Sequence, residues 1–317
     1  MKRFVTAMLC LGVFALAGTA NAQVVSIVTT PTGSYTNSAG SAMAKVISDK
    51  TKIHAIVQAQ AQAGMYAVEA GNAEFGMSNA FDTSFYIEGS AYYKGNGPQP
   101  NLREVGAILP LRVAMFVRKD SKIKSIADLK GKRVSAGFGS QKTVGRIIAA
   151  ELANAGLSYD DVQKVLAPNV SRAADDFTAG KTDVLFFAIG SAPVKRAAAT
   201  VGGLRALPVD SSPKAVARLQ KMLPGAYLTV VKPRPGLDGI SKPIKEVTID
   251  FLFFTNKNVK ADLVYQVTKA LHDNKAALTA IFKPFVHFDP AHMAVKVKSV
   301  PIHPGALKYY KEIGLLK

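Results

Sequence analysis

Two turns that are rich in glycine and hydroxyl side chains precede helical segments and could hold a small anion. The first is Gly33-Ser34-Tyr35, and the second runs from Gly139 to Thr143. A helix that begins at such a turn leaves backbone N–H groups unbonded at the positive end of its dipole. Helix termini of this kind bind carboxylate, sulfate or phosphate groups. If the two turns face one cleft, the sequence predicts a site for a small carboxylate.

Polar residues at other strand-to-helix turns extend this candidate site. Their hydroxyl and amide groups supply hydrogen-bond donors, while Lys142 and Arg112 add positive charge. Arg112 is the best single candidate for a carboxylate partner, because a planar guanidinium can bond both carboxylate oxygens. Ordinary helix capping is the competing explanation for each single turn. The predicted ligand contacts are Ser34, Tyr35, Asn37, Gln60, Asn79, Arg112, Ser140, Gln141, Lys142, Thr143, Gly190 and Ser191.

Patterns that would indicate catalysis are missing from the sequence. The second turn resembles a phosphate-binding loop but has Gln141 where that loop needs a glycine. His287 and His292 are the closest pair of histidines, and a five-residue step does not place two metal ligands on one helix face. We expect both to be solvated loop residues, and the adjacent acids at 160–161 and 175–176 to be solvated helix-start charges. The sequence predicts no enzyme activity, no catalytic residue, no metal and no cofactor.

The overall charge leaves several classes of anionic partner open. The chain has 317 residues, of which 48% are hydrophobic, and a formal net charge of +18. The densest basic group lies between residues 119 and 133, but Asp120 and Asp128 interrupt it and no aromatic residue is interleaved. Nucleic-acid binding sites usually combine cations with aromatic rings. We therefore interpret this segment as a solubilising basic surface and expect no nucleic-acid partner.

The first 22 residues have the features of a secretory signal. Lys2 and Arg3 precede a run of apolar residues, and Ala20-Asn21-Ala22 fits the small-x-small cleavage rule. Cleavage is predicted between Ala22 and Gln23, with the mature chain in the periplasm. That chain would have a formal charge of +16 and no cysteine, since the single Cys10 lies in the signal. Disulfides and thiol chemistry are then excluded.

Alternating β-type and helical patterns indicate an α/β protein. The sequence predicts two blocks of strand and helix, a strand that enters the second block at Leu111 and a strand that leaves it near Phe254. We interpret this as two lobes joined by two crossings: residues 23–110 with 257–317, and residues 111–256. The predicted strands are 24–28, 53–57, 75–78, 105–109, 111–118, 133–136, 183–188 and 248–254. Helices are predicted at 37–49, 62–69, 144–152, 261–282 and 304–313, with a capped helical turn at 125–128.

Four segments are similar to the TAXI family, the extracytoplasmic solute receptors of TRAP transporters. The Gly33-Ser34-Tyr35 turn resembles the Gly-Thr-Tyr turn of that family. Residues 118–134 resemble its entry into the second lobe, and residues 180–190 with Pro193 resemble its G-x-x-D-A-x-F-x-x-G-x-P stretch. The ending at residues 301–315 is the most specific of the four. The resemblance extends from Val24 to the C-terminus.

This resemblance implies a type II periplasmic-binding-protein fold, with a ligand cleft between two lobes that close. It also implies a partner, the membrane permease of an ion-driven transporter, and a small carboxylate ligand. The chain has Gln60 in a region where the family shows a Gly-Ser…Asn element. It has Asn79-Ala80-Phe81 where the family shows Gln-Ser-Asp. Since Phe81 cannot bind an amino group, we expect a ligand without an ammonium: a 2-oxoglutarate-like acid, a dicarboxylate or an aromatic acid.

Three other functions are compatible with the same sequence. One is a tricarboxylate-type receptor of a related tripartite system. The second is a secreted surface or immunogenic protein without a transport role, and the third is an enzyme built on the same fold. We expect a monomeric receptor.

Overall fold

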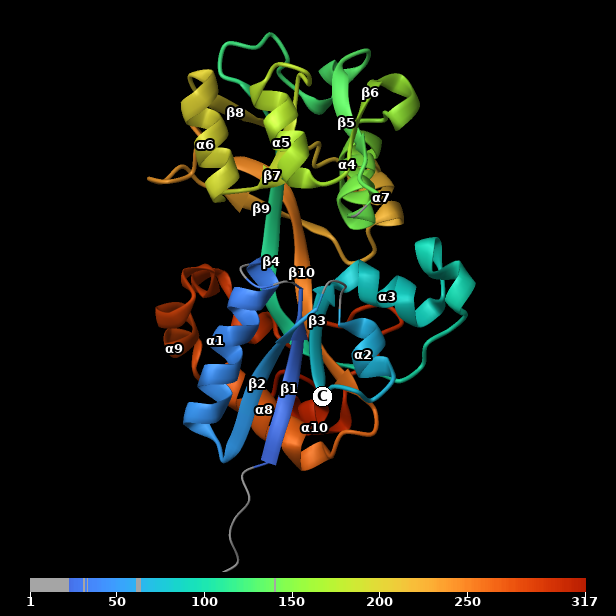
Figure 1. Cartoon of the computed structure of the whole chain (residues 1–317), viewed down its shortest axis with the longest axis vertical. Coiled ribbons are helices and arrows are strands. Elements are labelled where there is room, and N and C mark those ends of the chain that lie inside the picture. The colour runs from blue at the N-terminus through green and yellow to red at the C-terminus, as the bar shows by residue number, and fades with distance from the viewer. Residues whose placement is uncertain (1–22, 31, 33, 61–63, 140) are drawn as a thin grey trace, which may run out of the picture.

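The computed structural model describes residues 23–30, 32, 34–60, 64–139 and 141–317, which form two α/β lobes stacked along the long axis of the molecule (Figure 1). The expected signal segment, residues 1–22, lies outside the described residues. Two long antiparallel strands, β4 (Leu102–Arg118) and β10 (Ile244–Asn256), run through both lobes. The predicted two-lobed α/β architecture with two crossing strands is confirmed.

The first lobe contains a sheet in the order β2-β1-β3-β10-β4. Its strands β1, β2 and β3 are parallel, so their carboxyl ends reach the same edge, where α/β proteins commonly bind ligands. Both faces of the sheet are covered by helices, which is typical of parallel strands. The elements are β1 (Gln23–Thr29), α1 (Tyr35–Lys50), β2 (Ile53–Ala59), α2 (Met65–Glu69), β3 (Phe75–Asn79), α3 (Ala80–Glu88) and the 3-10 helix η1 (Ala91–Asn96).

The second lobe is assembled on the other halves of the crossing strands. Strands β7 and β8 pair with β4, β9 pairs with β10, and β5 pairs with β6. The helical turn predicted after Ser125 is confirmed as η2, with a capping box between Ser125 and Asp128. The elements are η2 (Ile126–Leu129), β5 (Arg133–Gly137), α4 (Lys142–Asn154), η3 (Tyr159–Asp161), β6 (Gln163–Ala167), α5 (Val170–Thr178), β7 (Leu185–Ala188), α6 (Ala192–Val201), β8 (Leu204–Leu207), α7 (Pro213–Met222) and β9 (Tyr227–Val231).

After β10 the chain returns to the first lobe and ends there. This tail comprises α8 (Ala261–Asp273), α9 (Lys275–Ile281), η4 (Lys283–His287), η5 (Pro290–His292) and α10 (Pro304–Glu312). The single helix predicted at 261–282 is wrong. The chain leaves the helical conformation at Asn274 (φ −121°, ψ 37°), whose Nδ2 donates to the carbonyl of Ala270 and caps α8. A second helix then begins at Lys275.

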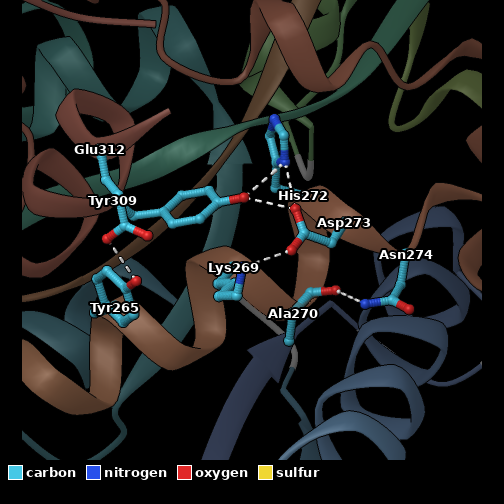
Figure 2. A network of polar contacts seen from close by, with 8 residues as sticks. All are labelled: Tyr265, Lys269, Ala270, His272, Asp273, Asn274, Tyr309 and Glu312. Atoms are coloured by element: carbon cyan, nitrogen blue, oxygen red, sulfur yellow. Dashed lines mark hydrogen bonds and ion pairs between the residues drawn. The ribbon is translucent and has the colours of Figure 1, made fainter. Parts of the chain in front are cut away.

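A polar network fixes α10 against α8 (Figure 2). The hydroxyl of Tyr309 donates to Asp273 Oδ1 at 2.6 Å, and Lys269 Nζ donates to Asp273 Oδ2 at 2.9 Å. Tyr309 also lies 2.9 Å from His272 Nδ1. Burial alone would raise the pKa of Asp273, but the bonds from Tyr309, His272 and Lys269 outweigh it and lower that pKa to about 2. The tail is thus held by an ionised carboxylate with several donors.

Strand β4 is continuous, so the prediction of separate strands at 105–109 and 111–118 is wrong. Pro110 pairs with Asp250 in the β4–β10 ladder, which continues on both sides of it. Gly106 of β4 lets the tail approach, because a Cβ there would lie 2.5 Å from the Tyr310 hydroxyl. The expected lobe boundary at 110/111 falls inside this strand, and the one at 256/257 falls at the end of β10. We keep those boundaries as a proposal.

Candidate ligand-binding site

A cavity of about 310 Å³ lies where the two strands cross between the lobes. It is lined by residues of β4, β9 and β10 and by the turns around η4 and η5. The second lobe therefore contributes one wall and the tail of the first lobe another. We call it the crossing cavity, and its polar lining includes Arg112, Tyr227, Thr229, Asp250, His287 and His292.

Two guanidinium groups meet at one histidine on the first wall of the crossing cavity. Arg112 Nη2 lies 2.5 Å from His287 Nε2, and Arg234 Nη2 lies 3.0 Å from the same atom. Since guanidinium can only donate, the Nε2 atom must be the acceptor of a neutral imidazole. Burial and the charges of Arg112 and Arg234 lower the pKa of His287 to about 4, in keeping with that neutral form.

The positive charge at this wall is not neutralised by a carboxylate. Neither Arg112 nor Arg234 forms an ion pair in the part of the chain that the structure describes. Burial and the nearby Arg234 lower the pKa of the half-buried Arg112. Two like charges near one imidazole repel each other, and an anion placed between them would relieve that repulsion. This wall of the crossing cavity therefore favours a negatively charged ligand.

The lining of the crossing cavity also contains a carboxylate that is already bonded. Asp250 is 4% exposed, and it accepts from the Tyr227 hydroxyl at 2.9 Å and pairs with His292 Nε2 at 2.8 Å. The hydrogen bond to Asp250 raises the pKa of His292, which favours the charged imidazolium. Asp250 and His292 then compensate each other, while the exposed Asp289, which accepts from the Ala291 N–H at 3.0 Å, adds one negative charge to the lining. The positive charge of the cavity is therefore confined to the side of Arg112 and Arg234.

Hydroxyl and amide side chains form a hydrogen-bond network at the start of α1, next to the first of the two turns that the sequence singled out. Ser34 caps the helix by accepting from the backbone N–H of Asn37 at 3.2 Å, and Thr30 Oγ1 donates to Ser34 Oγ at 2.7 Å. Asn37 Nδ2 donates to Thr29 Oγ1 at 3.0 Å. These contacts support the capping explanation of Ser34, although its hydroxyl stays partly exposed.

Tyr35 links the start of α1 to the crossing. Its ring packs against Phe251 of β10 and Phe282 of the tail, with centroids 5.9 and 5.3 Å away. Burial raises the pKa of the Tyr35 hydroxyl to about 12, and the positive charge of Arg112 opposes this rise. The predicted contacts Tyr35 and Arg112 are thus close enough to interact electrostatically.

The starts of α3 and α4 bring two further predicted residues together across the lobes. Thr143 Oγ1 of α4 donates to Asp82 Oδ2 of α3 at 2.7 Å. Asn79 precedes α3, and its side chain bonds the same Asp82 carboxyl. Burial raises the pKa of Asp82 to about 6, against the hydrogen bonds from Thr143 and Asn79 that lower it. Thr143 therefore connects the lobes by way of a buried acid.

Phe81 does not line the crossing cavity. Its side chain is 0% exposed and packs with Phe85 in a cluster that includes Val113, Ile147 and Ile148 of the crossing and second lobe. At the start of α3, Phe81 and Asp82 are both buried, and Phe81 packs with residues of the second lobe. Phe85 also lies under Arg146 of α4, 4.4 Å from the guanidinium carbon.

No side-chain hydrogen bond among the described residues joins the other predicted contacts to these groups. Gln60 follows β2 and donates through its backbone to Thr29, while Gln141 turns into the second lobe and accepts from the Val170 N–H at 2.8 Å. Lys142 is exposed at the start of α4. Gly190 and Ser191 form the turn before α6, where Ser191 Oγ is buried and has no partner among the described residues. Ser140 lies outside the described residues.

Several residues of the crossing cavity were missed by sequence reasoning. His287 and His292 were expected to be solvated, which is wrong, because both are half-buried and bonded to charged side chains. The acids at 175–176 were also misjudged: Asp176 is 4% exposed and pairs with Arg172 and Lys181. A usable signal was Asp250, the acid within the apolar strand predicted at 248–254. Tyr227 and Arg234 carried no such signal.

No group of three or more His, Cys, Asp or Glu side chains within the described residues could hold a metal ion. None of the helices that the structure describes is both long and apolar enough to span a bilayer.

Comparison with known proteins gives a consistent fold and a family. The chain is similar to a TctC solute binding protein from Polaromonas (TM-score 0.58, 15% identity, 94% of this chain and 100% of that one). It is also similar to the alkanesulfonate-binding protein SsuA from Xanthomonas axonopodis pv. citri (TM-score 0.50, 17%, 93% and 94%). A putative periplasmic sulfonate-binding protein SsuA from Methylobacillus flagellatus matches similarly (TM-score 0.51, 14%, 92% and 95%). At these identities the likeness shows the fold, which is the two-lobed periplasmic-binding-protein fold.

The family follows from the sequence itself. The family model of the NMT1-like family matches residues 27–314, which include both lobes and nearly all of the tail. The chain therefore belongs to the NMT1-like family.

Proposed function

We propose that the protein is a periplasmic receptor that captures a small organic anion between its two lobes and delivers it to an ion-driven TRAP-type permease. The observation that carries this proposal is the cationic wall of the crossing cavity. There, Arg112 and Arg234 converge on a neutral His287, and no described carboxylate pairs with either arginine. A planar carboxylate could bond Arg112 through two parallel hydrogen bonds.

The position of Arg112 supports capture by lobe closure. It lies on a crossing strand, so groups of both lobes surround it: Arg234 from the second lobe, and Tyr35 and His287 from the first. A ligand that bonds groups of both lobes stabilises the closed arrangement over the open one. The TAXI-like segments at 33–35, 180–190 and 301–315 support the TRAP permease as partner.

The bonding of the nearby acids supports a ligand without an ammonium group. Asp82 is bonded to Thr143, and Asp250 is bonded to Tyr227 and His292. The third acid, Asp289, lies at the exposed rim and caps η5 through the Ala291 N–H. We propose a 2-oxoglutarate-like acid, a dicarboxylate or an aromatic acid as ligand, which the receptor binds and releases without turnover.

A thermal-shift panel tests the proposed function. The panel contains 2-oxoglutarate, succinate, citrate, benzoate, glutamate and methanesulfonate, each titrated against purified protein. A ligand that binds only the native state raises Tm with concentration. We expect a rise with 2-oxoglutarate, succinate or benzoate. If no acid raises Tm, the receptor function is wrong. Tighter binding of glutamate than of 2-oxoglutarate and succinate would contradict the proposed ligand class, and citrate as the tightest ligand would indicate a tricarboxylate receptor.

Transport in proteoliposomes tests the partner. A TRAP-type permease of the same organism would be reconstituted, and uptake of the identified acid would be measured with a sodium gradient and without ATP. We expect uptake that requires both the receptor and the gradient. Uptake that proceeds without the receptor would contradict the proposed partnership.

A further inference from the structure

A strongly basic segment lies at the outer end of the second lobe, away from the crossing cavity. Between residues 118 and 133 the sequence has seven cations and two acids. The segment follows β4 and forms the loop at the end of the molecule opposite the first lobe (Figure 1). We call its exposed cations the basic tip: Arg118, Lys119, Lys122, Lys124, Lys130 and Lys132.

The charges of the basic tip are only partly offset by acids of the chain: Lys132 lies near Asp128 and Asp183, and Lys130 lies near Asp161. None of its six cations forms an ion pair in the part of the chain that the structure describes. The acids nearby have other partners. Asp128 accepts from the backbone N–H groups of Lys124 and Ser125 at 2.8 and 2.9 Å, and Asp183 pairs with Arg133. A net positive field therefore extends from this end of the protein.

The loop that bears the basic tip is held in place by hydrogen bonds from strand β8. Arg205 of β8 donates to the carbonyl oxygens of Lys119, Ser121 and Ile123 at 2.6–2.8 Å. The apolar side chains of the loop, Ile123 among them, are buried in the second lobe. The cations are thus presented by a fixed backbone, which reduces the entropy lost on binding a partner.

A hollow of about 360 Å³ opens within this charged end. Its lining includes three cations of the basic tip, Arg118, Lys122 and Lys132, together with Arg133 and the acids Asp120 and Asp183. Since Asp183 is paired with Arg133, the remaining lining has an excess of positive charge. A phosphate group could enter such a hollow while the surrounding lysines face further anions.

We propose that the basic tip docks the receptor on anionic phospholipids of the periplasmic membrane leaflet through their phosphate groups. Five of its six cations are lysines, and no aromatic residue stands between residues 118 and 133. Protein–protein interfaces are depleted in lysine and depend on aromatic and arginine anchors. Anionic lipid surfaces instead attract clusters of exposed cations, with no apolar anchor required.

Docking of this kind would leave ligand capture unaffected, because the crossing cavity lies at the other end of the second lobe. The receptor would diffuse along the membrane that contains the permease, with its cavity accessible. This proposal does not depend on the identity of the ligand.

Vesicle sedimentation tests the proposal. Protein purified after secretion would be mixed with phosphatidylcholine vesicles with or without 30% phosphatidylglycerol, at low and at physiological salt. The tip variant carries Lys122→Glu, Lys130→Glu and Lys132→Glu. The control variant carries Lys52→Glu, Lys260→Glu and Lys296→Glu, three exposed lysines of the first lobe that give the same change of net charge. Circular dichroism and ligand-induced Tm shifts verify that both variants are folded.

We expect binding to the anionic vesicles only, weakened by salt because exposed charges are screened. Each lysine near an anionic surface contributes roughly a five-fold gain in partitioning, so loss of three lysines alone should weaken binding about 100-fold, and the three glutamates should weaken it further. The control variant should retain most of the binding. Equal binding by the tip and control variants, or no binding of the native protein to anionic vesicles at low salt, would overturn the proposal. Binding of inorganic phosphate in calorimetry without vesicle binding would also overturn it, and would identify a free-anion site instead.

Discussion

His287 is the residue on which the electrostatics of the crossing cavity depend. Its Nε2 atom accepts from Arg112 and faces Arg234, which requires the neutral imidazole. Protonation at this position would place three positive charges together within a partly buried space. A bound carboxylate would reverse this, since it would neutralise the arginines and make protonation of His287 easier.

The lowered pKa of His287, about 4, makes the folded protein sensitive to mild acid. Between pH 6.5 and 4 the unfolded chain takes up a proton that the folded chain does not, so the free energy of unfolding falls as pH falls. We expect His287→Gln, which keeps an acceptor but does not titrate, to flatten this fall. Urea unfolding at pH 4.5 and pH 7 measures it. The same substitution at the exposed His54 of β2 is the control, and equal slopes for the two variants would contradict the assignment.

At the scale of single elements, the attachment of α10 to α8 depends on the hydroxyl of Tyr309. Tyr309→Phe removes the bond to the ionised Asp273, and we expect it to lower the free energy of unfolding by about 1.5–3 kcal/mol at pH 7. Because the pKa of Asp273 is lowered to about 2, this contribution is present above about pH 4 and disappears as pH falls towards 2. Tyr265→Phe, which removes a bond to the exposed Glu312, should cost less than about 1 kcal/mol. Equal losses in denaturant unfolding would contradict this account.

Two buried acids, one on α4 and one on β10, lie close to each other in the second lobe. Glu151 and Glu246 are both 0% exposed and have no hydrogen-bond partner among the described residues. Burial raises the pKa of Glu151 to about 8, and burial together with Glu151 raises that of Glu246 well above its ordinary value. The folded chain thus holds protons that the unfolded chain releases above about pH 4.3.

The contribution of Glu151 and Glu246 to stability should therefore fall as pH rises from about 4.5 to 8, opposite in sign to the contribution of His287. Glu151→Gln keeps the shape of the side chain without a titrating group. We expect it to raise Tm relative to the native protein at pH 8, and to do so less at pH 5. Glu312→Gln on the exposed face of α10 is the control, with the native pH dependence. A Tm difference that is the same at both pH values would show that Glu151 is not the titrating group.

The elements with a strong sequence pattern could be predicted, and those that depend on distant partners could not. Strand β1 and helix α1 were predicted within two residues of their ends, because a short run rich in β-branched residues and helical spacing are local signals. Helix α3 was missed, since seven of its nine residues are buried by the second lobe and no polar face marks it as a helix. In the site, the turns before α1 and α4 were found from glycine and hydroxyl residues. The partners of Arg112 were not, because His287 lies 175 positions away.

At the scale of the whole molecule, two groups of contacts hold the lobes together. One is at the crossing cavity, and the other is between the starts of α3 and α4, where Thr143 bonds the buried Asp82. The contact between the starts of α3 and α4 does not involve the proposed ligand. The balance between open and closed receptor is therefore set in part by Thr143, and a ligand at Arg112 shifts it further.

Thr143→Val tests this division because valine has nearly the shape of threonine but no hydroxyl donor. The variant leaves the buried Asp82 carboxyl without that bond, which favours separation of the lobes in the absence of ligand. We expect a larger radius of gyration in small-angle X-ray scattering than for the native protein, and a decrease when the ligand is added. Thr200→Val on the exposed part of α6 is the control. An unchanged radius for Thr143→Val without ligand would contradict a role of this bond in closure.

Calorimetric titration of Arg112→Ala with the acid that gives the largest Tm shift tests the central claim most directly. Loss of a charged hydrogen-bond partner should weaken binding by about 1.5–3 kcal/mol, or roughly 10- to 150-fold in Kd. Arg118→Ala, on the same strand but at the basic tip, should bind the acid as the native protein does. Native affinity in Arg112→Ala would contradict the account, because the anion would then be held by some other part of the molecule.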